Sequence, residues 1–301
     1  MTDFYIVDVF TQGKYTGNQL AVFLDGGRFS SGQMQTLARE THFSETTFIM
    51  DAHASYSDPA RYSVRIFTPA SEIPFAGHPT LGTAFVIAQT LLETPAPRIE
   101  LAMGAGIIPV DITYDQGRPD WLTMTQNQPI FGETMDHGAM AECLGVPVTA
   151  LDSGFPVQIV STGLPFALVA MRSLRDVQKC SVRTDVLRRL MDHFPDLNIL
   201  VFTTETVLPQ HDLHARVFVP ELGVSEDPAT GSAAGCLCAF LLRYGMPNET
   251  APRSAFSLKL EQGYQIMRPS LLSITGSRNR DHYDIRVGGR VEWVARGELL
   301  G

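Results

Sequence analysis

Cysteine is scarce in this chain, and its spacing argues against metal or disulfide chemistry. The four cysteines are Cys143, Cys180, Cys236 and Cys238, and none of them has the spacing of a zinc site. Cys236 and Cys238 would point to different sides of a helix rather than form one ligand face. We therefore interpret all four as core residues and expect no metal.

Basic clusters and long hydrophobic runs are also missing. The 23 Lys and Arg residues are outnumbered by 32 Asp and Glu residues, for a formal charge of −9. Binding to nucleic acid or to an anionic membrane is therefore not expected. The apolar runs near 81–92 and 233–242 are shorter than the ~20 residues that span a bilayer. Residues 1–8 lack the basic segment of a signal peptide, so we expect a cytoplasmic protein.

Nucleotide-binding motifs are absent as well. The sequence contains no P-loop, and its glycine-rich segments do not follow the strand, G-x-G-x-x-G, helix order of a dinucleotide site. We accordingly expect no cofactor. With 301 residues, of which 44% are hydrophobic, the chain can form a large core and is expected to have two domains.

The most informative stretch is residues 225–235 (SEDPATGSAAG), followed by an apolar run to Leu242. Asp227 is a suitable N-cap, with Pro228 at the first helical position, so we expect a helix to begin here. The small residues that follow allow a ligand to approach closely. The first N–H groups of a buried helix attract negative charge, which predicts an anion site.

A similar arrangement occurs in the first half of the chain. Residues 65–69 (RIFTP) resemble residues 216–220 (RVFVP), 151 positions later. Each segment is followed by an X-Pro helix start, at His78 in the first half and at Asp227 in the second. An apolar helix is then expected over 80–92 and over 230–242. The repeat predicts two lobes of one design. We expect their two helix N-termini to face each other across a cleft.

The remaining pattern predicts an α+β protein, because strands and helices do not alternate regularly. Ser30 and Gln33 form a plausible capping box for a helix that ends near Thr41. Glu45 follows where a loop becomes a strand, although a solvated loop carboxylate is an alternative interpretation. Further helices are expected over 136–144 and 184–193. Strands are expected over 4–10, 20–24, 46–50, 61–67, 99–102, 107–112, 122–125, 157–160, 166–170, 198–203, 257–260, 265–267, 271–275, 282–287 and 291–295.

Several motifs together resemble the phenazine-biosynthesis PhzF-like isomerase family. They are 17–22 (GNQLAV), 42–48 (HFSETTF), 67–69 (FTP) with 74–80 (PFAGHPT), 226–235 (EDPATGSAAG), and 261–263 (EQG) with 268–270 (RPS). The resemblance covers the whole chain in order. It implies the diaminopimelate epimerase-like fold: two pseudo-symmetric lobes, each a mixed β-barrel-like sheet around a central helix. The N-terminal lobe would span 1–125, with residues from about 289 to 301 returning to it, and the C-terminal lobe 126–288.

The resemblance also implies residue roles. Glu45 is the expected proton-transferring group, and His78, Asp227 and Ser232 are expected to bind and orient the substrate. The backbone N–H groups of Gly77 and Gly231 would hold its carboxylate. A homodimer is retained as a candidate assembly. The family's type reaction is isomerisation of trans-2,3-dihydro-3-hydroxyanthranilate, which makes a small cyclic or unsaturated carboxylic acid the expected substrate.

The residue types agree with that chemistry. Moving a proton between carbons needs a carboxyl group whose pKa is raised toward neutrality by partial burial. His78 and Asp227 offer a second titratable pair, and helix N-termini can stabilise developing negative charge. The alternative is a purely structural role, in which His78 and Asp227 only cap their helices and Ser232 is a small packing residue.

Three other functions remain open from the residues. An amino-acid racemase of the same fold would need a thiol at each helix start, where this chain has Ala76 or Gly77 and Asp227. A glycosidase could use Glu45 and Asp227 as its carboxylate pair, although small-residue helix starts suit a compact acid better. A binding or interaction protein could have kept the fold and lost turnover.

Overall fold

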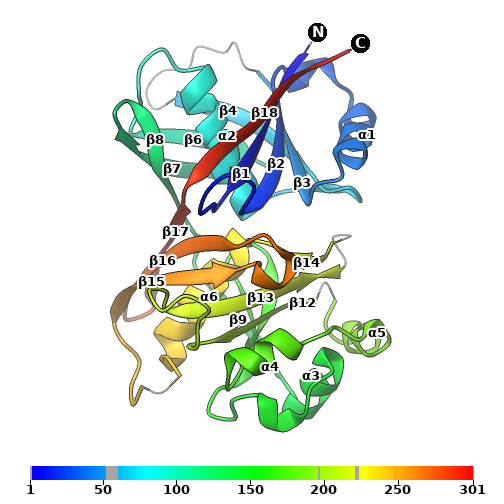
Figure 1. Ribbon diagram of the computed structural model, residues 1–301, viewed down its shortest axis with the longest axis vertical. Helices are drawn as coiled ribbons and strands as arrows, with labels where there is room; N and C mark the ends of the chain where they lie inside the picture. Colours follow the sequence, from blue (N-terminus) through cyan, green and yellow to red (C-terminus); the bar gives the residue numbers. More distant parts are fainter. Residues whose placement is uncertain (1, 52–59, 196, 221–223, 248, 301) are drawn as a thin grey trace. The chain divides into compact units, whose positions relative to one another are not determined.

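The computed structural model describes residues 2–51, 60–195, 197–220, 224–247 and 249–300 (Figure 1). The chain divides into two compact units. Unit 1 comprises residues 1–125 and 288–301, and unit 2 comprises residues 126–287. Each unit is described by itself below. Among the described residues, no helix is both long and apolar enough to cross a membrane.

Unit 1 is a mixed sheet curved around one helix. Its strand order is β18–β1–β2–β3–β4–β6–β7–β8, with the short β5 paired to β4. The β2/β3 and β4/β6 pairs are parallel and the others are antiparallel. The elements of this unit are β1 (Thr2–Val9), β2 (Asn18–Phe23), η1 (Gly26–Arg28), α1 (Ser31–Thr41), β3 (Glu45–Ile49), β4 (Ala60–Phe67), β5 (Glu72–Ile73), α2 (Gly77–Thr90), β6 (Arg98–Met103), β7 (Gly106–Asp115), β8 (Arg118–Thr125) and β18 (Val291–Leu299).

Helix α2 forms the centre of unit 1. Its first twelve residues are all buried, so it lacks the polar stripe of a surface helix. It packs against β1, β2, β3, β6, β7 and β8, which explains why it is buried on every side. Helix α1 instead covers the outside and begins at the predicted capping box, with Ser30 and Gln33 bonded reciprocally.

Unit 2 repeats this plan around α6. The strand order is β9–β10–β11–β12–β13–β15–β16, with β14 paired to β13. The elements are β9 (Ile130–Met135), α3 (His137–Leu144), η2 (Val148–Ala150), β10 (Val157–Ser161), β11 (Pro165–Ala170), α4 (Leu174–Lys179), α5 (Thr184–Met191), β12 (Asn198–Thr203), β13 (Leu213–Val219), β14 (Val224–Asp227), α6 (Gly231–Tyr244), β15 (Ala255–Gln262), η4 (Tyr264–Ile266) and β16 (Ser270–Asn279). Strand β17 (His282–Gly289) leads the chain back to unit 1.

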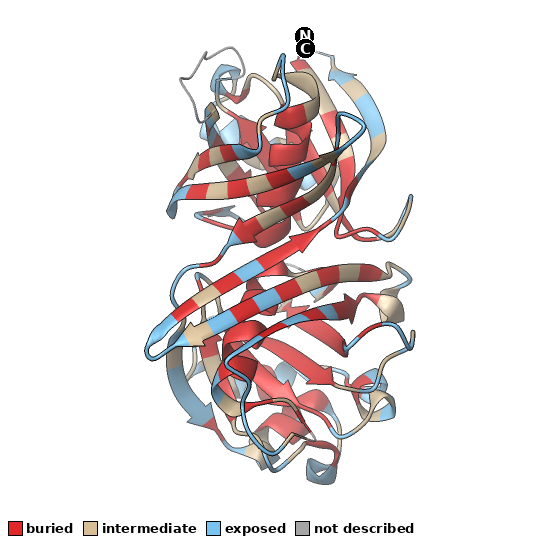
Figure 2. Cartoon of the chain, turned by 90° about the vertical axis from the view of Figure 1, so that its left-hand side faces the viewer, coloured by how far each residue is buried: buried red, intermediate tan, exposed pale blue. Residues whose placement is uncertain are grey.

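Helix α6 is buried over its first twelve residues, like α2, and it contacts β10, β11 and β16. Figure 2 shows the contrast with strands β15 and β16, on which buried residues alternate with exposed or half-buried ones. That alternation is the period of a strand with one face on the core and one face in water.

The two units share one design down to individual side chains. In both, the strand pairs run antiparallel, antiparallel, parallel, antiparallel, parallel and antiparallel in the same order. Arg65 lies over the Phe67 ring at 5.1 Å and forms an ion pair with Glu72. Arg216 lies over Phe218 at 4.9 Å and pairs with a glutamate of β14 in the same way. The duplication predicted from the sequence is confirmed.

Some predicted boundaries were wrong. Asp227 is the last residue of β14 and not a helix N-cap, because α6 begins at Gly231 with Thr230 as its N-cap. Helix α2 likewise begins at Gly77, one residue before His78. The strand expected over 265–267 is part of a 3₁₀ turn, since the positive φ angles of Gly263 and Met267 do not fit a strand. Strand β9 and helix α4 were not predicted.

Candidate active site

Glu45 is positioned by an abrupt change of structure after α1. The helix ends at Thr41, and its C-cap residue His42 has a φ of 55°, in the left-handed region, which redirects the chain. Three residues later Glu45 opens β3, which runs between β2 and β4. The residue is only 7% exposed, so the interpretation of Glu45 as a solvated loop carboxylate is wrong.

His78 lies beside Glu45. It is the second residue of α2, it is 3% exposed, and its Nε2 lies 3.4 Å from Oε2 of Glu45. Its other ring nitrogen, Nδ1, lies 3.1 Å from the side-chain Nδ2 of Asn18, the first residue of β2. With the Asn18 amide donating to Nδ1, a neutral ring carries its proton on Nε2, the nitrogen that lies 3.4 Å from Glu45 Oε2.

A second contact fixes the helix against the strand. The hydroxyl of Thr83 in α2 donates to the hydroxyl of Thr47 in β3 over 2.9 Å, and both side chains are fully buried. Thr47 lies two residues after Glu45 and therefore faces the same side of the strand. This bond holds α2 at a fixed position along β3, and with it the spacing between His78 and Glu45.

Burial keeps the imidazole of His78 neutral. Loss of contact with water lowers its pKa to about 3, and a backbone hydrogen bond with Gln19 opposes this shift only in part. At physiological pH His78 is accordingly an uncharged hydrogen-bonding group. Helix α2 has no side-chain cap, so His78 does not act as a cap for its own helix.

Unit 2 brings together Asp227, Gly231 and Ser232 at the start of α6. Asp227 is 5% exposed, and its Oδ2 accepts a hydrogen bond of 2.5 Å from the Thr230 hydroxyl. Gly231 and Ser232 are the first two residues of α6 and both are buried. Because Thr230 bonds Asp227, its side chain does not cap the helix. Both central helices therefore begin without a side-chain cap.

The structure thus groups the predicted residues by unit. Glu45, His78 and Gly77 come together in unit 1, and Asp227, Gly231 and Ser232 in unit 2. Three polar residues that touch these groups were not predicted, namely Asn18, Thr230 and Gln262. All three lie within the sequence motifs quoted above, which was the only signal that could have found them.

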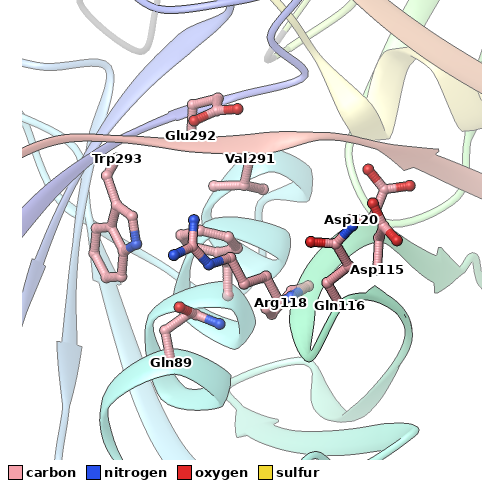
Figure 3. Close-up of a pocket in the computed structure, with 10 residues that line it drawn as sticks. Gln89, Asp115, Gln116, Arg118, Asp120, Val291, Glu292 and Trp293 are labelled. Carbon is pink, nitrogen blue, oxygen red and sulfur yellow. The ribbon is translucent and has the colours of Figure 1, made fainter.

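A separate cavity of about 730 Å³ lies in unit 1 between α2, the turn joining β7 and β8, and β18. Figure 3 shows Arg118 reaching into it between Trp293 and Gln89. None of the predicted site residues lines it. The cavity is therefore distinct from the Glu45–His78 pair.

Among the described residues, the groups placed at the candidate site include no thiol and no cluster of metal ligands. All four cysteines are free and buried, and burial raises the pKa of Cys143 and of Cys236 to about 11 and that of Cys180 to about 12. In the part of the chain that the structure describes, no three His, Cys, Asp or Glu side chains gather as metal ligands would. The candidate chemistry therefore depends on carboxyl, imidazole and amide groups.

Two central helices, each wrapped by a mixed sheet, define a class of fold shared with epimerases. A hydroxyproline epimerase from Agrobacterium vitis superposes with a TM-score of 0.59 over 98% of this chain and 91% of its own, at 13% identity. A PhzF-family protein from Bacillus anthracis superposes with a TM-score of 0.86 over 100% of this chain and 99% of its own, at 26% identity. The fold is diaminopimelate epimerase-like.

The sequence comparisons identify the family. Residues 7–297 match the phenazine biosynthesis-like protein family, PhzC-PhzF. An uncharacterized isomerase of Clostridium acetobutylicum is 31% identical over 98% of this chain and 97% of its own. The trans-2,3-dihydro-3-hydroxyanthranilate isomerase of Pseudomonas fluorescens is 31% identical over 100% of this chain and 96% of its own. This chain belongs to the PhzF family and is an isomerase of that family.

Proposed function

We propose that this isomerase moves a proton between two carbons of a small cyclic or unsaturated carboxylic acid, with Glu45 as its single acid/base group. The observation that carries the proposal is the buried pair of Glu45 and His78, whose Oε2 and Nε2 atoms lie 3.4 Å apart. A carboxyl group held in this way can accept a proton from one carbon and return it to another.

The reaction balances without a cofactor. The Glu45 carboxylate takes a proton from a C–H bond, and the electron pair of that bond enters the adjoining unsaturated system. The protonated Glu45, whose O–H can exchange with water, then delivers a proton to a second carbon of that system. His78 stays neutral, because its pKa of about 3 is far below physiological pH. Its Nε2 lies 3.4 Å from the Glu45 carboxyl group, and the neutral ring adds no charge there.

The substrate carboxylate is assigned to the helix starts. The N–H groups near Gly77 and Gly231 would accept it, since the N-terminus of a helix favours negative charge. The absence of a side-chain cap on either helix supports this assignment. Ser232 and Asp227 would bind a hydroxyl or amine next to the reacting carbon.

The thiol-dependent racemase is the weaker alternative. The N-cap residues of the two central helices are Ala76 and Thr230, so neither helix start carries a thiol. Burial also holds the pKa values of Cys143, Cys180 and Cys236 well above neutrality, so these thiols stay protonated at pH 7 and cannot accept a proton. A single carboxyl group fits these residues better.

The test is proton exchange in deuterated water. The protein is incubated with trans-2,3-dihydro-3-hydroxyanthranilate and with a panel of cyclic, unsaturated and amino acids, and mass spectrometry follows deuterium at carbon. We expect deuterium gain or isomerised product for at least one acid and none with Glu45→Gln. Binding without exchange across the panel would favour a binding protein that has lost turnover, and exchange that persists in Glu45→Gln would refute the role of Glu45.

A further inference from the structure

The start of α6 departs from the usual behaviour of a threonine N-cap. Such a threonine normally accepts a hydrogen bond from the second or third N–H of its helix. In this chain the hydroxyl of Thr230 donates to Oδ2 of Asp227 and makes no cap bond. Some other group must hold that hydroxyl in its unusual direction.

Gln262 makes the contacts that do so. Its Nε2 donates to the Thr230 hydroxyl oxygen over 3.1 Å and to the backbone carbonyl of Asp227 over 2.7 Å. Its Oε1 accepts the backbone N–H of Thr230 over 3.2 Å. With the amide reversed, its NH₂ group would face the Thr230 N–H, and its oxygen would face the Asp227 carbonyl oxygen. The network therefore fixes the orientation of the amide. One fully buried side chain thus binds both ends of the segment 227–230.

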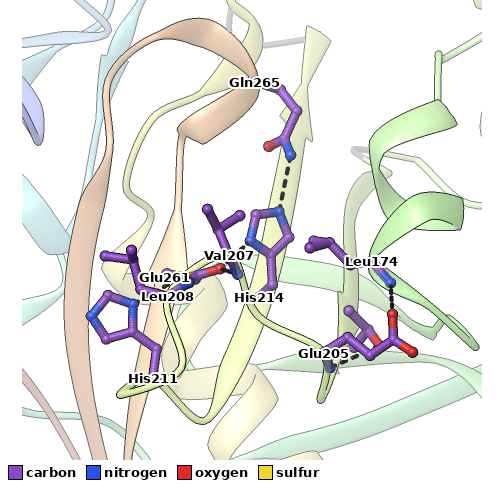
Figure 4. Close-up of polar contacts among 9 residues, drawn as sticks. Leu174, Glu205, Val207, Leu208, His211, His214, Glu261 and Gln265 are labelled. Atoms are coloured by element: carbon purple, nitrogen blue, oxygen red, sulfur yellow. Dashed lines mark hydrogen bonds and ion pairs between the residues drawn. The ribbon is translucent and has the colours of Figure 1, made fainter.

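The end of β15 holds Gln262 in place from both sides. Gly263 follows with φ of 80°, and a Cβ atom there would overlap the carbonyl oxygens of Pro228 and Arg268. On the other side, the buried carboxylate of Glu261 accepts hydrogen bonds from Nδ1 of His211 at 2.6 Å and Nδ1 of His214 at 2.8 Å (Figure 4). The backbone at Gln262 therefore has little freedom to move.

We propose that Gln262 is a positioning residue: it directs the Thr230 hydroxyl to Asp227 and so keeps the first N–H groups of α6 uncapped for a substrate carboxylate. The inference rests on the proposed function for its link to turnover. Because the Thr230 oxygen accepts from Gln262, its own proton is directed to the carboxylate, and such chains of hydrogen bonds strengthen one another. Without Gln262 the Thr230 hydroxyl is released to cap α6 and to occupy the amides that the substrate needs.

A matched pair of variants separates positioning from stability. Gln262→Leu removes the proposed contacts. Gln158→Leu is the control, because Gln158 is also a buried glutamine of unit 2, bonded to the Gly132 carbonyl at 2.9 Å and to the Tyr244 hydroxyl at 2.7 Å. With trans-2,3-dihydro-3-hydroxyanthranilate, or whichever acid of the panel is turned over, we expect kcat/KM to fall about 10- to 100-fold in Gln262→Leu. The fall in Gln158→Leu should be less than about threefold, at a comparable loss of unfolding free energy.

A second readout does not depend on turnover. The titration of the Asp227 carboxyl is followed by carbon-13 NMR and assigned by the resonance that Asp227→Asn removes. Losing a hydrogen bond to the charged form should raise its midpoint by about one pH unit in Gln262→Leu and leave it unchanged in Gln158→Leu. Gln262→Glu keeps the acceptor for the Thr230 N–H but loses both donors, so it should shift the Asp227 midpoint in the same direction. This variant replaces Gln262→Leu in the experiment if the leucine variant does not fold.

The outcomes distinguish this inference from the proposed function. An unchanged Asp227 midpoint in both Gln262 variants would overturn the inference whatever the activity. A shifted midpoint in a protein that turns over no acid would support the positioning role and refute the proposed function. A Thr230→Val change should cost little more once Gln262 is leucine, because the two side chains act through one hydroxyl. Fully additive losses would contradict the inference.

Discussion

Glu45 and Asn198 occupy equivalent positions in the two units. Glu45 opens β3 and pairs with Leu20 of the parallel strand β2, and Asn198 opens β12 and pairs with Phe166 of the parallel strand β11. The duplicated fold therefore carries a carboxyl group at one of these positions and an uncharged amide at the other. This asymmetry supports a reaction with one acid/base group rather than a symmetric pair.

Glu45→Gln should abolish turnover while changing ligand affinity by less than roughly tenfold. The amide keeps the shape of the side chain but cannot transfer the proton, a step worth about 10²- to 10⁴-fold in rate. Deuterium incorporation measures turnover, and calorimetric titration with the same acid measures affinity. The control is Glu142→Gln, an exposed carboxyl group in unit 2 that pairs with Arg189, which should leave both unchanged. Wild-type turnover in Glu45→Gln would show the assignment to be wrong.

Because His78 is buried in its neutral form, the free energy of unfolding should decrease as the pH falls. Its pKa is about 3 in the folded protein and near 6.5 when unfolded, so between these values the unfolded chain binds the extra proton. Stability therefore rises with pH across this window, by at most about 1.4 kcal/mol per pH unit from one group. Urea unfolding between pH 7.5 and 4.5 should give a shallower pH dependence for His78→Asn. Parallel curves for the two proteins would contradict the buried neutral state of His78.

Glu261→Gln should destabilise the protein by about 3 kcal/mol near pH 7, since it weakens charge-assisted hydrogen bonds in a fully buried site. Burial alone would raise the pKa of Glu261, but hydrogen bonds from His214, the backbone of Val207 and His211 outweigh it and lower the pKa. The stabilisation is therefore present above the unfolded pKa of about 4.5 and is lost as the pH falls through the lower folded value.

The matched control for this change is Glu205→Gln. Glu205 is exposed and accepts one hydrogen bond, from the Leu174 N–H at 2.8 Å (Figure 4). Its loss should cost less than about 1 kcal/mol in urea unfolding. Equal effects of the two changes would refute the special weight given to the Glu261 cluster.

Gly231→Pro should weaken carboxylate binding about 10- to 100-fold while leaving α6 folded. Gly231 is the first residue of the helix, where proline is well tolerated, and the change removes one backbone donor worth about 1.5–3 kcal/mol to a charged ligand. Gly231→Ala keeps that donor and is the control. Raising the salt concentration from 50 to 500 mM should change the affinity of the unsubstituted protein less than the proline substitution does. Strong salt dependence with little effect of proline would point to a surface Lys or Arg instead.

The sequence by itself determined much of the architecture. The periodicity of hydrophobic residues and the turn residues predicted most strands, and the Ser30–Gln33 capping box marked the start of α1. The RIFTP and RVFVP segments revealed the duplication. These signals could be found in the sequence because each of them is local. The motif around Glu45 pointed to that carboxyl group. That His78 and Asp227 bind one ligand, and that the chain forms a homodimer, remain predictions from the sequence.

The tertiary structure decided which groups meet. The His78 and Glu45 side chains lie 33 positions apart in sequence, and only the packing of α2 on β3 brings them within 3.4 Å. The sequence placed the helix start at Asp227, where the local cap preference is satisfied. The fold uses Asp227 to end a strand and bonds it to Thr230, because pairing with β13 and the contacts of Gln262 outweigh a single cap.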